Sequence, residues 1–390
     1  MLLGHPLTEP DRLALSPLFA AVVCVCLVIS IEELSKKLPP NREMDPAPDD
    51  RFGPLGPRRA AARAVSLIVL LVCIAAGRIG ANDQLDNIAP ALIVGLAWPL
   101  LAVASVVVGR VWAVVDPFDT MARSFRTWTG GDRLDQASDD VSWALPATIA
   151  WVWFLSAYPE ALDPRSVGTA LGLYTIATLA GCLVVGRRTW LDRGEFFGSF
   201  YTWVGVLTRG GASRWRAPAN SDLVLGALIG GLLFGEVRLS SLWGSLNVRP
   251  SATLLATGGV LGFAAAGAAL LRLSDPGRRH SAAAALPLAA AVVVAVALAR
   301  NRMFTSLQLL PALIADPFGF DWNAVGPAPE AIDPAPLGET GLTFLQLGLV
   351  LVGGAAGAIV ARRRLVEDAW RVVGAVCILT AGAVMALMVV

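Results

Sequence analysis

Residues 252–299 run ATLLATGGVLGFAAAGAALLRLSDPGRRHSAAAALPLAAAVVVAVALA. Two apolar stretches, Ala252–Leu271 and Ala282–Ala299, flank a short gap that contains arginines. A helix needs roughly 17–25 mostly apolar residues to cross the hydrocarbon core of a bilayer, which is about 30 Å thick. Each stretch is long enough, so this part of the chain predicts two membrane-spanning helices joined by a basic loop.

The same pattern recurs along the chain of 390 residues. Its composition is 55% apolar and only 16% charged, which is too little charge for the surface of a soluble domain of this size. The ten apolar stretches are Leu15–Ile31, Ala64–Ile79, Ile88–Gly109, Ser142–Ser156, Gly168–Gly186, Leu223–Gly235, Ala252–Leu271, Ala282–Ala299, Leu342–Ala361 and Ala369–Val390. We therefore expect an all-α bundle of about ten transmembrane helices, with residues 1–390 forming one polytopic membrane domain.

The sixth stretch, Leu223–Gly235, is short. It either extends through Val237–Leu246 or forms a half-helix, and eight spans result if it and one neighbour do not cross. Trp98-Pro99, inside the third stretch, predicts a kink, because proline removes one backbone hydrogen bond from a helix.

Basic residues fall in alternate gaps between the spans. Of the 31 Lys and Arg residues, 24 lie in or beside the gaps after odd-numbered spans, and the other 7 lie elsewhere. The positive-inside rule places the first group in the cytoplasm. A multi-pass protein of a prokaryotic cytoplasmic membrane with both termini outside is expected. The formal net charge of +1 gives no field that would select nucleic acid, so the expected partners are the lipid bilayer, other subunits of a membrane complex, or a second copy.

Three segments between the expected spans have a distinctive composition. The cytoplasmic loop 32–63 and the acidic outer loop 316–340 are rich in proline, which disfavours helix. The segment 195–208 places Phe196, Phe200 and Val204 on one helical face, next to basic residues. It predicts an amphipathic helix at the membrane interface.

Pairs of glycines four residues apart recur in the apolar stretches. They are Gly226 and Gly230, Gly231 and Gly235, Gly258 and Gly262, and Gly353 and Gly357. Such pairs let helix backbones approach closely. We expect them to pack helices within the bundle, with a homo-oligomer contact as the alternative.

The tripeptide Asp-Pro-Phe occurs twice, after the third and the eighth span. It predicts a turn, because the residue before proline avoids helical geometry; the alternative is an inverted repeat of five plus five helices, as in many transporters. The residues of these two turn signatures are Asp116, Pro117, Phe118 and Asp119, then Asp316, Pro317, Phe318, Asp321 and Trp322.

Polar residues within the apolar pattern are the candidate ligand-binding residues. Arg300, Asn301 and Arg302 interrupt two apolar stretches, and Glu236 and Arg238 end the glycine-rich sixth segment. At the membrane surface these side chains would only snorkel to water. Inside the bilayer they would need a partner or a cavity, and would mark an anion-binding or transport site.

Catalytic and metal-binding motifs are not found. The chain has two histidines and five cysteines, without HxxxH, CxxC, GxSxG or P-loop spacing. No catalytic residue, metal site or cofactor is therefore predicted from spacing.

Four segments resemble a group of mostly actinobacterial polytopic membrane proteins known as fenitrothion hydrolases. They are NIAPALIVGLAWPLLAVASVVVGRVWAVVDPFDT (residues 87–120), GRRTWLDRGEFFGSFY (186–201), IADPFGFDWNAVGPA (314–328) and QLGLVLVGGAAGAIVA (346–361). The resemblance implies hydrolysis of organophosphorus esters, with Asp116, Asp119, Asp316 and Asp321 as the available carboxylates. The family pattern often has histidines where this chain has Arg300 and Gly354.

These features favour a non-enzymatic function. We expect a permease or channel-like protein, or the membrane subunit of a larger complex. The alternative is the membrane-embedded hydrolase that the resemblance implies.

Overall fold

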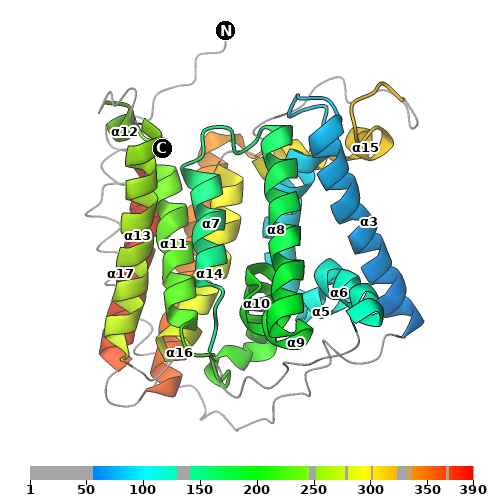
Figure 1. Ribbon diagram of the computed structural model, residues 1–390. Coiled ribbons are helices and arrows are strands. Elements are labelled where there is room, and N and C mark those ends of the chain that lie inside the picture. Colours follow the sequence, from blue (N-terminus) through cyan, green and yellow to red (C-terminus); the bar gives the residue numbers. More distant parts are fainter. Residues whose placement is uncertain are drawn as a thin grey trace.

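The computed structural model describes residues 56–129, 141–245, 252–276, 280–299, 302–322, 333, 336–365 and 369–389. Within these residues the regular structure is helical, apart from one isolated bridge between Val141 and Ala219. The helices form a bundle in which the long helices run roughly parallel from one end to the other (Figure 1).

Seven helices are long and apolar enough to cross a membrane, so the fold is that of an integral, multi-pass membrane protein. They are α3 (Pro57–Ile79), the continuous pair η1 (Pro90–Ala97) and α4 (Trp98–Val108), α8 (Pro164–Val185), α13 (Ala252–Ser274), α14 (His280–Ala299), α16 (Gly338–Arg364) and α17 (Ala369–Val389). The first expected span, Leu15–Ile31, lies outside the described residues.

Shorter helices fill the rest of the described chain. They are α5 (Val111–Val115), α6 (Pro117–Thr129), α7 (Leu145–Ser156), α9 (Arg187–Arg193), α10 (Phe196–Val204), the 3₁₀ helix η2 (Gly205–Ser213), α11 (Ser221–Val237), α12 (Ser241–Ser245) and α15 (Arg302–Ala315). The fourth and sixth expected spans correspond to α7 and α11, with 12 and 17 residues. Of the two alternatives for the sixth span, an extension through Val237–Leu246 is not one helix over its described part, which ends at Ser245. Ser240 turns the chain there, because its Oγ donates to Val237 O and accepts from Trp243 N.

Glycines and alanines set the packing around α11 and α14. A Cβ on Gly230 would lie 2.1 Å from Phe263 O of α13, and one on Gly357 would lie 2.3 Å from Ala284 O of α14. Three of the four predicted glycine pairs therefore pack helices inside the bundle, as expected. A Cβ on Gly258 or Gly262 would meet no neighbouring atom of the described residues within 4 Å.

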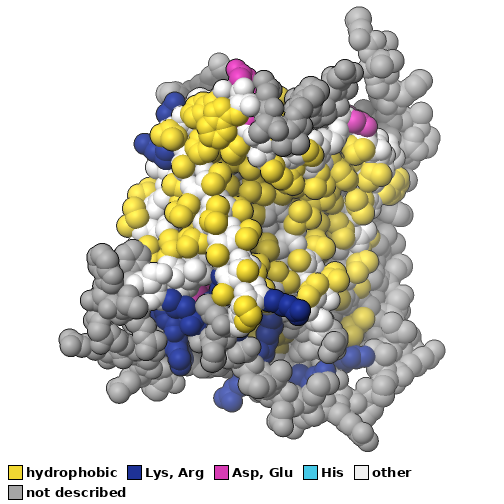
Figure 2. Space-filling view, turned by 90° about the vertical axis from the view of Figure 1, so that its right-hand side faces the viewer, with side chains coloured by type: hydrophobic (Ala, Val, Ile, Leu, Met, Phe, Trp, Pro, Cys, Tyr) yellow, Lys and Arg dark blue, Asp and Glu magenta, His cyan; other side chains and the backbone are white. Residues whose placement is uncertain are grey.

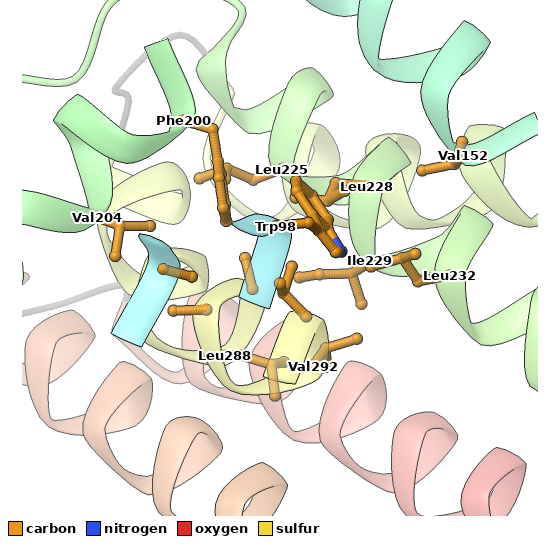
Figure 3. Close-up of a cluster of buried hydrophobic side chains, with 14 of the residues drawn as sticks. Trp98, Val152, Phe200, Val204, Leu225, Leu228, Ile229, Leu232, Leu288 and Val292 are labelled. Atoms are coloured by element: carbon orange, nitrogen blue, oxygen red, sulfur yellow. The ribbon is translucent and has the colours of Figure 1, made fainter. Parts of the chain in front are cut away.

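The kink expected at Trp98-Pro99 takes the form of a π-helix. Residues Pro90–Ala97 are wound as π-helix and Trp98–Val108 as α-helix. Next to this proline, Tyr201 Oη donates to Trp98 O at 3.1 Å, which ties α10 to the span. Figure 3 shows Trp98 beside Leu228 and Ile229 of α11 and near Phe200 of α10, in the centre of the core.

The two ends of the bundle differ in charge. Seen from the side, a wide apolar band separates the many Lys and Arg side chains at the bottom from an upper end where acidic side chains and a smaller group of basic side chains lie (Figure 2). We call these the basic end, where α3 begins and α6 and α9 lie, and the acidic end, where α15 lies (Figure 1). The apolar band is where a bilayer would surround the protein.

Two local expectations are corrected. The loop expected to reach Arg63 ends earlier, because α3 starts at Pro57, a residue that favours the first helical turn. The segment 195–208 does form a helix, α10, but Phe196, Phe200, Tyr201 and Val204 are all buried. Its second face is aromatic as well, so α10 packs inside the protein and does not lie on the bilayer surface.

Candidate functional site

An apolar cavity of about 510 Å³ lies between α7 and α8. This volume falls in the range of pockets that hold drug-sized ligands. Its lining residues come from η1, α7, α8, α9 and α10; four of them are tryptophans, Trp143, Trp151, Trp153 and Trp190. Of the described residues that line it, none is charged. Leu173, also in the lining, is 63% exposed, so the cavity opens sideways, in the band where lipid would lie.

A buried polar pair, Tyr174 and Glu195, lies at one wall of the apolar cavity, and only Tyr174 of the two lines it. Tyr174, in the lining, donates its hydroxyl to Glu195 Oε1 at 2.5 Å. The Glu195 carboxylate also caps the start of α10, because it accepts from Phe197 N at 2.9 Å and Gly198 N at 2.5 Å. The pair thus fixes α10 against α8 and holds the aromatic face of α10 toward the cavity.

An aromatic barrier closes the cavity on its inner side. Trp98 packs edge-on against Trp151 and Phe197, with ring centroids 5.6 and 5.9 Å apart. Both of these partners line the cavity. Trp98 also stacks on Phe200 at 5.6 Å. Because Trp98 itself is 4% exposed, this cluster forms a wall of rings between the cavity and the centre of the bundle.

A second, polar cavity lies on the other side of Trp98. Its volume is about 20 Å³, enough for about one water molecule. Glu236 of α11 and Arg302 of α15 both line it, together with Trp98 and Ser156. Glu236 is 1% exposed. Val94 also lines this cavity, about one turn into the span that begins at Pro90, so Glu236 and Arg302 line a cavity inside the protein.

The other predicted ligand-binding residues are placed as follows. Arg238 donates Nη1 to Ser156 O at 2.9 Å, and so ties the end of α11 to the end of α7. Burial lowers the pKa of the Arg238 guanidinium. Arg300 and Asn301 lie outside the described residues. The structure therefore brings Glu236 and Arg302 to one cavity and leaves Arg238 beside it.

A buried charge network lies at the basic end, where the sequence suggested only a turn. Asp119 of α6 pairs with Arg63 of α3 and Arg187 of α9, and Arg123 Nε donates to it at 2.8 Å. Burial alone would raise the pKa of Asp119. The hydrogen bond from Arg123 and the charges of Arg63 and Arg187 outweigh that effect and hold this pKa below its ordinary value. The network joins three helices that are far apart in the sequence.

The two Asp-Pro-Phe turns lie at opposite ends of the bundle, beside α6 and after α15 (Figure 1). Asp116 Oδ1 accepts from Asp119 N at 3.0 Å and starts α6. Asp316 Oδ2 accepts from Trp322 N at 3.1 Å. Phe318 stacks on Phe320, and Trp322 packs at an angle against both rings. Asp119 and Asp321 therefore do not share a site. Whether the two halves superpose as a repeat stays a prediction.

Metal-binding side chains do not cluster in the part of the chain that the structure describes. No group of three or more His, Cys, Asp or Glu residues there could hold a metal ion. Within the same residues Cys73, Cys182 and Cys377 lie in helices and form no disulfide.

Sequence reasoning missed the apolar cavity and the Asp119 network. The one signal for the cavity is tryptophan spacing, since Trp143, Trp151 and Trp153 lie within a single short segment. A cavity depends on how helices diverge, which no local pattern encodes. The sequence places Arg63 in a solvated loop, because an arginine next to a proline-rich segment is normally exposed.

The chain matches no protein-family model, no curated protein and no solved structure.

Proposed function

We propose that this protein is a membrane carrier for amphipathic organic molecules that enter it from the bilayer. The apolar cavity between α7 and α8 is the observation that carries the proposal. Its volume suits a small organic ligand, its described lining is uncharged, and Leu173 and Trp143 at its edge are exposed. A ligand dissolved in lipid could therefore reach it without crossing water.

The polar cavity supplies the second element of the proposed route. A carboxylate and a guanidinium inside a membrane protein are costly, and such groups commonly mark substrate or ion pathways. Glu236 and Arg302 lie across the Trp98 barrier from the apolar cavity. In the proposal, movement of Trp98 connects the two cavities, and Arg302 then meets the polar group of the substrate.

The proposal includes an orientation. The basic end faces the cytoplasm by the positive-inside rule, and α7, α11 and the segment Leu15–Ile31 complete the ten expected spans. Both termini then lie outside. Cysteines introduced near residues 120 and 330 should react with an impermeant reagent from opposite sides of the membrane; labelling from one side would refute this topology.

Ligand binding tests the carrier proposal directly. Bromine quenches tryptophan fluorescence on contact, and four of the 12 tryptophans line the apolar cavity. Adding 1-bromooctane to the purified protein should quench a distinct, saturable fraction of the emission. The Ala177→Phe variant fills the cavity and should lose that fraction. Ala180→Phe is the matched control, because Ala180 is an exposed α8 residue outside the lining.

Transport needs its own measurement. In vesicles, the protein should speed the crossing of an NBD-labelled ester whose spontaneous crossing is slow, followed by dithionite quenching. Ala177→Phe should reduce that rate, and Ala180→Phe should not. Equal quenching and equal rates in the two variants would remove the cavity from any transport role.

The membrane-subunit alternative differs in one measurable respect. Native mass spectrometry of the protein, gently extracted from its own membrane, would then show a stoichiometric partner. A monomer or homodimer that carries only lipid supports the carrier.

A further inference from the structure

The apolar cavity is long and narrow. Every turn of α8 from Val167 to Thr178 contributes at least one lining residue. A helix rises about 1.5 Å per residue, so the cavity is roughly 16 Å long. Its volume of about 510 Å³, spread over that length, gives a mean cross-section of roughly 30 Å². The cavity is therefore a slot that runs parallel to α8, between this helix and the lining residues of α7.

The dimensions of the slot suit one alkyl chain. An extended chain advances roughly 1.2 Å per bond, as an extended peptide does, so the slot accepts about 12–14 carbons. A methylene group takes up about 30 Å³, close to the liquid volume of a water molecule, so one such chain needs roughly 400 Å³ and two need nearly 800 Å³. The apolar cavity, at about 510 Å³, holds one chain and not two.

The slot is closed at the acidic end of the bundle. Its lining stops there at Phe154 and Val167, which are both buried. Phe154 stacks on Tyr158, with ring centroids 5.8 Å apart, and the loop of residues 157–163 joins α7 to α8 at that end (Figure 1). Side chains thus fill the space beyond the slot, and a bound chain would end at Phe154.

The other end of the slot, at the basic end, is more open and more positive. Trp143 lines the slot there and is 38% exposed, and its backbone N donates to Arg193 O of α9 at 2.7 Å. Helix α9 carries three arginines and one aspartate, whereas residues 157–165, at the closed end, carry two acids and one arginine. Even with Arg187 paired to Asp119, this difference favours a negative group beside α9.

We infer that the apolar cavity binds a fatty carboxylate of about 12–14 carbons, with its single chain in the slot and its charged head beside α9. The inference rests on the proposed carrier function and narrows its substrate class. Ala170 and Ala177 of α8, which both line the slot, then determine specificity, because larger side chains at these positions would fill it near the closed end and near the open end.

A series of chain lengths tests the inference on the full-length purified protein. Saturated fatty acids compete with 1-bromooctane quenching, and each affinity is expressed against the free aqueous concentration of the acid. Affinity should rise about fourfold with each added methylene, the value for burying one such group. It should level off beyond about 14 carbons, where the slot ends. A rise that continues without a break to about 18 carbons would be partition into detergent, and would overturn the inference.

Two variants test the direction of the chain. Ala170→Leu shortens the slot to roughly 12 Å and should move the break to about 10 carbons, with little effect on octanoate. Ala177→Leu, nearer the open end, should weaken the binding of all chain lengths by a similar factor. Ala180→Leu is the matched control, because Ala180 lies outside the lining. The reverse pattern in the first two variants would contradict the assigned direction.

The charge of the head is tested with two amphiphiles of equal chain length. Dodecanoate should bind about two- to fivefold more tightly than dodecyltrimethylammonium, the range of an exposed ion pair. Equal binding, or tighter binding of the cation, would refute the assignment of the head to α9. The chain-length and head-group measurements on the unaltered protein hold even if a variant fails to fold. If 1-bromooctane itself causes no saturable quenching, the carrier proposal loses its basis as well.

Discussion

Two groups of helices in this protein differ in the side chains that pack between them. The small-residue group, α11, α13, α14, α16 and α17, is held together by glycines and alanines that bring backbones into contact. The aromatic group, α7, α8, α9, α10 and the Pro90–Val108 span, is held by stacked rings around Trp98. Small residues leave no space between helices, whereas large rings of fixed shape leave gaps where they do not meet. The apolar cavity lies in the aromatic group.

The ion pairs of the two helix groups also differ in how deeply they are buried. Asp119, which joins α3, α6 and α9 beside the aromatic group, is fully buried with Arg63 and Arg187. In the small-residue group, Arg272 of α13 donates Nε and Nη2 to Asp222 of α11 at 2.5 and 2.9 Å, but the arginine is 39% exposed. Helices whose backbones are in contact need little further stabilisation from ion pairs. Helices separated by rings and a cavity depend on a buried network to hold their ends.

Replacing Asp119 should therefore cause the largest loss of stability. Asp119→Asn leaves the buried charges of Arg63 and Arg187 without their carboxylate, a change that typically costs about 3–5 kcal/mol. Asp222→Asn is the matched control and should cost at most about 1 kcal/mol, because that pair is partly exposed. Denaturation of both variants in the same detergent measures the difference. Equal losses would contradict the proposed division.

Adding a side chain at a close helix contact should have a smaller effect. Gly230→Val places methyl groups against the α13 backbone and should cost about 1–3 kcal/mol through overpacking. Gly258→Val, on α13, meets nothing within 4 Å at its Cβ and should be close to neutral. Thermal unfolding of the two variants compares them. A destabilised Gly258→Val would show instead that this glycine faces a partner, such as a second copy.

The sequence predicts these two groups to different extents. Spans such as Ala252–Leu271 follow from length and apolarity, and the structure extends that helix only to Ser274. The glycine pairs predict close packing, because spacing on one helix is a local property. The cavity depends on rings from separate segments, such as Trp151 and Trp190. Glu236 and Arg302 stand out in the sequence as polar residues in apolar surroundings, but their shared cavity requires the fold.

Acid should weaken the Asp119 network only slightly over the usual working range, and this is the smallest expected effect. The folded-state pKa of Asp119 lies below its ordinary value, which is about 3.9 in unfolded chains. A depressed carboxylate pKa stabilises the fold above the unfolded value, and that contribution is lost as pH falls through the folded value. The stability advantage of the unaltered protein over Asp119→Asn should therefore stay constant from pH 7 to about pH 5 and begin to decline only near pH 4. An advantage that fell already between pH 7 and 6 would mean that another group controls the network.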